Sequence, residues 1–65
     1  MKYSLFDTVS LTENIPEYNL KSGMIGAIID VYTKPDESYE VEFCDENGRT
    51  IEILALSPDK LSKVS

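Results

Sequence analysis

The sequence predicts an all-β fold, a small five-stranded barrel with one short helical turn before the last strand. Apolar residues recur at every second position along most of the chain, and helical spacing extends over no useful length. Gly23 and Gly26 stand at the entry to the longest apolar run, where a strand of a small barrel has to bend. These two observations together favour a closed β fold over a helical one.

The chain length limits the protein to a single domain over residues 1–65 with a thin core. One cysteine and no histidine exclude an intramolecular disulfide and the usual zinc ligand sets. We therefore expect no metal and no cofactor, and a monomer or weak homo-oligomer held by apolar contacts. The lone thiol and the lack of a signal peptide favour the cytoplasm, and no apolar run approaches the roughly 20 residues of a membrane helix.

The first half of the chain predicts two strands joined by a long loop. Alternation over 7–11 predicts the first strand, and turn-forming residues fill 12–23. The second strand is predicted over 25–33. We expect Gly23 to adopt a positive φ at the end of the loop, and Gly26 to permit a bend or a close backbone approach.

The second half predicts a hairpin of strands 39–43 and 50–56 around the sequence DENGR. A two-residue turn at Asn47 and Gly48 would place Phe43, a core residue, opposite Glu52. A three-residue loop of residues 46–48, with Gly48 left-handed in a bulge, instead places Phe43 opposite Ile51. We predict this second register.

The remaining elements complete the predicted barrel. Ser57 and Pro58 indicate a single helical turn over 57–61, and a last strand follows over 61–64. Alternation in the chosen register predicts the buried residues. The predicted core comprises Val9, Leu11, Ile29, Val31, Val41, Phe43, Ile51 and Ile53.

This order of elements resembles an SH3-like barrel. The stretches LFDTVSLTENIPEYNLKSGMIGAIIDVY and YEVEFCDENGRT, with the ending LALSPDKL, resemble domain of unknown function 4926, a family of small bacterial proteins common in cyanobacteria. That resemblance implies no established activity, cofactor or site residue. The glycine-containing entry at 20–26 is also similar, more weakly, to nucleic-acid-binding barrels of the KOW class.

Composition and charge narrow the function classes. The chain has no histidine to activate Cys44, and the carboxylate pairs lie on an exposed hairpin, so we expect no enzyme and no catalytic residue. Nucleic-acid binding is the alternative hypothesis: Lys21 and Lys34 at adjacent loop tips would contact phosphates, and neighbouring tyrosines would stack on bases. Six basic residues against twelve acidic ones argue against it.

The distribution of charge favours a protein-interaction module. Residues 36–52 carry seven acidic residues and one arginine, which accounts for the whole net charge of −6. The chosen register sets Glu40 opposite Leu54 and Glu42 opposite Glu52 on the outward face. These four residues are the predicted partner-binding strip, with Leu54 as its apolar centre. We therefore predict an accessory, regulatory or antitoxin-like protein that docks a partner with a basic surface through the 39–56 hairpin.

Overall fold

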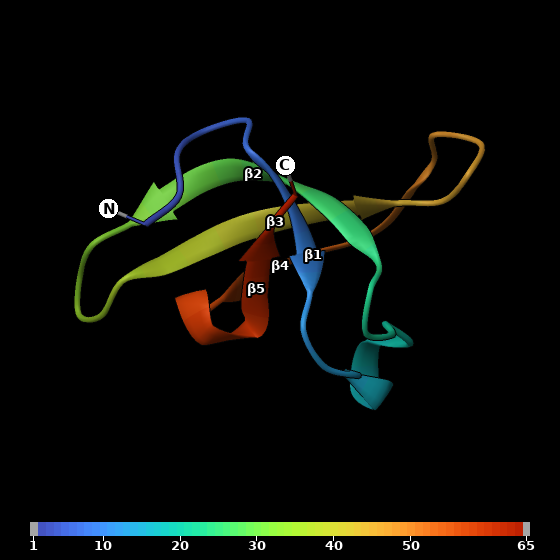
Figure 1. The fold of residues 1–65 in the computed structure, drawn as a ribbon, viewed down its shortest axis with the longest axis horizontal. Helices are drawn as coiled ribbons and strands as arrows, with labels where there is room; N and C mark the ends of the chain where they lie inside the picture. Colours follow the sequence, from blue (N-terminus) through green and yellow to red (C-terminus); the bar gives the residue numbers. More distant parts are fainter. Residues whose placement is uncertain (1, 65) are drawn as a thin grey trace.

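The protein folds into one antiparallel sheet of five strands, and the computed structural model describes residues 2–64 (Figure 1). The strands lie in the order β4-β3-β2-β1-β5. The elements are β1 (Thr8–Leu11), η1 (Pro16–Tyr18), β2 (Ile25–Tyr32), β3 (Ser38–Cys44), β4 (Thr50–Leu56), η2 (Pro58–Lys60) and β5 (Leu61–Lys63). The predicted all-β class, the five strands and the short helical turn before the last strand are confirmed.

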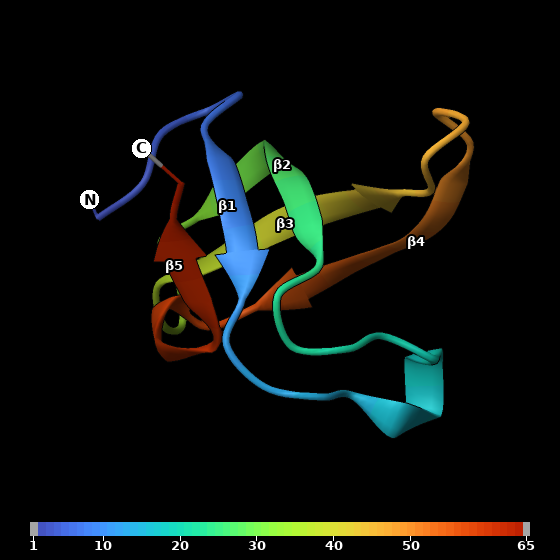
Figure 2. The same ribbon diagram turned by 45° about the vertical axis from the view of Figure 1, so that its right-hand side comes forward.

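The sheet is strongly curled but remains open. Figure 2 shows β1 and β5 crossing β3 and β4 at a steep angle. The first half of β2 pairs with β1, and β2 also pairs with β3, so this strand links the two parts of the sheet. In the described part of the chain, no ladder joins β4 to β5. The last strand, which was expected to close the barrel, has only three residues and pairs with β1, so the barrel is not closed.

The core lies between the two parts of the curled sheet. Val9, Leu11, Val41 and Phe43 are buried as predicted, whereas two further predicted core residues, Ile29 and Val31, are only half-buried. Ile51 and Ile53 are exposed and do not belong to the core. The buried apolar residues are Tyr3, Val9, Leu11, Leu20, Ile28, Tyr39, Val41, Phe43, Leu56 and Leu61.

A bulge divides β2. Ile28 lies opposite Val41, whereas Asp30 lies opposite Glu40, so Ile29 is an extra residue without a partner on β3. Ile28 is consequently buried and Ile29 only half-buried. The bulge therefore reverses the assignment of these two isoleucines that strict alternation predicts.

The three glycines have the roles expected of them. Gly23 and Gly48 have φ angles of +90° and +81°, which side-chain-bearing residues rarely adopt. A Cβ atom on Gly26 would lie only 2.7 Å from Val41 Cγ1 and 3.0 Å from Phe43 Cδ1. Gly26 thus permits β2 to approach β3 closely over the core.

The β3–β4 turn has the predicted loop. The N–H of Asp45 donates to the carbonyl of Arg49 at 2.8 Å, and the N–H of Gly48 donates to the carbonyl of Asp45 at 3.0 Å. These bonds and the left-handed Gly48 define the three-residue loop.

Beyond the turn, β4 departs from the predicted register. Cys44 lies opposite Thr50, but Phe43 lies opposite Glu52, so Ile51 is an extra residue in β4. The predicted Phe43–Ile51 pairing is therefore wrong. A shift of one residue exchanges the two faces of a strand. Each side chain of β4 after Ile51 therefore lies on the face opposite to the predicted one.

This exchange determines which side chains of β4 are exposed. Leu54 lies opposite Val41 and packs against the core, and Leu56 in the same row is buried. Ile51 and Ile53 are 39% and 43% exposed. The strand still contributes two apolar side chains to the core, but they are the leucines and not the isoleucines.

A tyrosine pair fixes the N-terminal segment over the core. The rings of Tyr3 and Tyr39 meet edge to face with centroids 5.3 Å apart. The Tyr39 hydroxyl donates to the Glu37 carboxylate and accepts from the backbone N–H groups of Lys2 and Tyr3, each at 3.1 Å. The Tyr3 hydroxyl donates to the carbonyl of Leu61 at 3.0 Å. The pair thereby joins residues 2–3 to both β3 and β5.

Candidate functional site

The structure divides the four residues of the predicted strip between two faces. Glu40 and Glu42 lie on the outward side of β3. Glu52 and Leu54 lie in the rows that face the core, and both are half-buried. The predicted Glu42–Glu52 opposition and the central position of Leu54 are therefore wrong, because the extra residue Ile51 shifts β4 by one position.

A different set of side chains lies around the two outward glutamates. We call this surface of β2, β3 and β4 the outer face; its residues include Ile25, Ala27, Asp30, Glu40, Glu42 and Ile53. Glu42 lies between Ala27 of β2 and Ile53 of β4. Ile25, two residues before Ala27, is 51% exposed. A hollow of about 220 Å³ opens here and is lined by Ile25, Ala27, Glu42 and Cys44, among others. Exposed apolar side chains with polar residues around them mark interaction sites on many proteins.

The acidic groups of the outer face are organised by hydroxyl donors. The Tyr32 hydroxyl donates to Glu40 Oε1 at 3.1 Å, and Thr50 Oγ1 donates to Glu42 Oε2 at 2.5 Å. The hydrogen bond to Glu40, with partial burial and the charges of Glu40 and Asp30, raises the pKa of Tyr32. The phenol therefore stays neutral at physiological pH, and the carboxylates carry the charge of this face.

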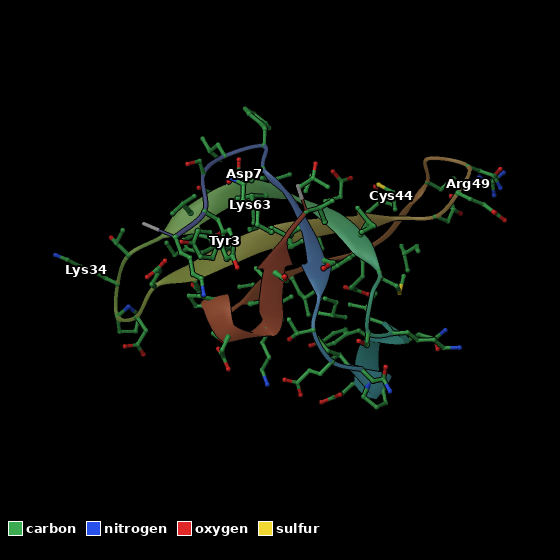
Figure 3. All side chains as sticks on the ribbon, viewed as in Figure 1. Tyr3, Asp7, Lys34, Cys44, Arg49 and Lys63 are labelled. Atoms are coloured by element: carbon green, nitrogen blue, oxygen red, sulfur yellow. The ribbon has the colours of Figure 1, made fainter. Side chains whose placement is uncertain are left out.

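The lysines predicted to lie at adjacent loop tips are far apart in the fold. Lys21 precedes β2 and Lys34 follows it, so the two residues lie at opposite ends of an eight-residue strand. The basic side chains at the loop tips are also widely separated: Figure 3 shows Lys34 and Arg49 at opposite tips of the molecule. Tyr18 and Tyr32 are exposed, but Tyr32 is bonded to a carboxylate. The basic pair on which the nucleic-acid hypothesis depended is not formed.

Residues 2–64 contain no cluster of three or more Cys, Asp or Glu side chains placed to hold a metal ion. Cys44 is an exposed free thiol. Over the same residues, no helix is long and apolar enough to cross a membrane.

The comparison with protein families bears on the whole fold. A family model described as domain of unknown function (DUF4926) matches residues 5–63, from the turn before β1 to the end of β5. The chain belongs to this family. For this DUF4926 protein, the curated proteins contain no match and neither do the solved structures.

Proposed function

We propose that this DUF4926 protein is a non-catalytic protein-interaction module, an accessory or regulatory subunit that binds a partner with a basic surface through the outer face. One observation carries the proposal: the extra residue Ile51 turns Ile53 outward beside Glu42. Ile53 is 43% exposed and belongs neither to the core nor to the half-buried side chains that pack against it. On a partner it supplies the apolar centre of a contact, and the acids around it select a basic rim.

The charge of the outer face supports the same partner chemistry. Asp30 and Glu40 lie opposite each other across β2 and β3, and Glu42 follows on the same side of β3. Like charges placed directly opposite one another repel. A basic partner surface relieves that repulsion, so its binding is favoured by complementary charge and by faster encounter at low salt.

Affinity capture from host cells at moderate salt, followed by measurement on the purified complex, tests this function. We expect one stoichiometric protein partner. Ile53→Ser should weaken its binding about tenfold or more, as loss of a central apolar contact does. Glu42→Gln keeps an acceptor for Thr50 but removes the charge, and should slow association, most strongly at low salt.

Glu46→Gln provides the matched control, because it removes the same charge at the exposed hairpin turn, away from Ile53. This variant should bind nearly as wild type does. Thermal unfolding of each variant separates lost contacts from lost folding. Wild-type affinity in both Ile53→Ser and Glu42→Gln would refute docking through the outer face.

A further inference from the structure

The outermost strand of the sheet leaves a row of backbone groups without a neighbour. Strand β4 pairs only with β3, and within residues 2–64 no other segment pairs with its far edge. In an antiparallel sheet, alternate residues of such a strand direct N–H and C=O groups outward. An exposed edge of this kind accepts a further strand unless something prevents it.

Only the first half of the free edge of β4 is protected against the addition of another strand. The bulge at Ile51 and the inward-facing charge of Glu52 are two devices that discourage strand addition, and both lie in the first half of β4. The opposite edge of the sheet, β5, has three residues and includes Lys63. Leu54 to Leu56 form the stretch of edge that carries no such device.

A groove runs along this unprotected stretch. It has a volume of about 480 Å³, and its lining includes Leu54, Ala55 and Leu56 on one side and Ile15 and Tyr18 on the other. Successive side chains of a strand point to opposite faces. A hollow lined by three consecutive residues therefore follows the edge of the strand and does not cover a single face.

The far wall of the groove is already ordered. Ile15 and Leu20 exchange backbone hydrogen bonds of 2.9 and 3.1 Å around η1. Leu20 is buried in the core, and Asn19 completes the turn with a left-handed φ of 60°. A preformed wall lowers the entropy cost of binding, because little has to be ordered when a ligand arrives.

The charges beside the groove select its occupant. Lys60 is paired with Glu13 at 2.8 Å. Among the described ion pairs none involves Glu17, an exposed acid in the first turn of η1 that also lines the groove. A second copy of this chain would bring its own acidic surface, with a net charge of −6, to this acidic wall. Charge complementarity therefore favours a basic occupant over self-association.

We propose that an extended segment of another protein, with alternating apolar and basic side chains, adds to β4 at Leu54–Leu56 as a sixth strand. Its backbone bonds to the free edge, its apolar side chains lie against Leu54 and Tyr18, and a basic side chain pairs with Glu17. This is strand addition to an exposed edge, in which main-chain bonds give affinity and alternate side chains give specificity. The site does not depend on the outer face.

Selection of a phage-displayed random decapeptide library on the immobilised protein tests this proposal. We expect enrichment of peptides with alternating apolar and basic residues. The best peptide, made synthetically, should slow amide hydrogen exchange at Leu54–Leu56. N-methylation of the alternate peptide residues whose N–H groups face β4 should abolish binding, because it removes the main-chain hydrogen bonds. Glu17→Lys should weaken the peptide roughly fivefold or more, whereas Glu46→Lys, the same change at the hairpin turn, should have a much smaller effect.

Several results would overturn the proposal. These are the absence of any enrichment, equal enrichment on Glu17→Lys, or selected peptides without basic residues. Selected peptides that lose binding to Ile53→Ser but not to Glu17→Lys would place the contact on the outer face instead. Sedimentation of the protein alone as a dimer that Glu17→Lys disrupts would assign the edge to a second copy. The comparison of wild type with Glu17→Lys does not involve the outer face, so this proposal and the proposed function can fail separately.

Discussion

Asp30 and Glu40 are the like-charged residues that face each other across the sheet. The sequence predicts a repulsive pair on this face but assigns it to Glu42 and Glu52, which the bulge in β4 separates. Glu40 accepts a hydrogen bond from Tyr32, and Asp30 Oδ1 accepts one from the N–H of Val31. Each carboxylate therefore has a local partner while remaining close to the other.

Replacement of Asp30 by Asn should stabilise the fold by a few tenths of a kcal/mol. The amide oxygen still accepts from Val31, and the repulsion from Glu40 is removed. The gain should shrink as salt screens exposed charges. Urea unfolding at low and high ionic strength measures it. Equal stability of Asp30→Asn and wild type at low salt would show that the two carboxylates do not interact.

Single residues whose roles are local are predictable from the sequence. The sequence identifies Gly23, Gly26 and Gly48, because few residues other than glycine tolerate a positive φ or a close backbone approach. The sequence does not identify Tyr3 as a core residue. It lies outside every strand, and only the distant partners Tyr39 and Leu61 explain its burial.

Among the elements, the β3–β4 hairpin combines a turn that local sequence predicts with a strand register that it does not predict. The loop around Gly48 follows from turn chemistry, which is local, so the sequence predicts it. The sequence does not predict the extra residue Ile51, because each alternating set of β4 residues contains large apolar side chains, the isoleucines in one set and the leucines in the other. Alternation cannot choose between the isoleucines and the leucines. Packing against β3 decides, and it buries Leu56 while leaving Ile53 exposed.

Deletion of Ile51 distinguishes the two registers. In the observed pairing, the deletion removes the extra residue and leaves every later pair with β3 intact. We expect a folded protein that loses no more than about 1 kcal/mol, the ordinary cost of a mild substitution. In the predicted pairing, the same deletion would shift the whole strand by one residue and expose its core face. Chemical denaturation and the amide NMR spectrum distinguish these results, and severe unfolding would contradict the bulge.

For the whole molecule, hydrogen bonds attach the N-terminal segment to the sheet. Glu37 accepts from the buried Tyr39 hydroxyl and from the backbone N–H of Lys2, and these bonds lower the pKa of Glu37. Burial and the contact with Glu37 raise the pKa of Tyr39, so this hydroxyl remains a donor at neutral pH. One carboxylate thus connects the N-terminal segment to β3.

The lowered pKa of Glu37 means that this carboxylate stabilises the fold at neutral pH and that the stabilisation is lost in acid. Its contribution to stability is complete above the pKa of the unfolded chain, and is lost as pH falls through the lower pKa of the folded state. Glu37→Gln should therefore flatten the decline in melting temperature between about pH 5 and pH 2. Thermal unfolding across that range measures the difference. Glu46→Gln, at the exposed turn, is the control, and parallel curves for Glu37→Gln and wild type would contradict the prediction.

The pairing of β1 with β5 also determines when during synthesis the protein can finish folding. The Tyr3 hydroxyl and the carbonyl of Leu61 are 58 residues apart along the chain, and β5 pairs with β1 over the same region. Long-range contacts of this kind form late, because closing a large loop costs entropy before any contact repays it. A nascent chain that has not yet released residues 61–63 from the ribosome leaves β1 with an open edge and Tyr3 without its acceptor. A partner that arrives before residues 61–63 have emerged would therefore meet an unfinished domain, and recognition of the complete sheet has to follow their emergence.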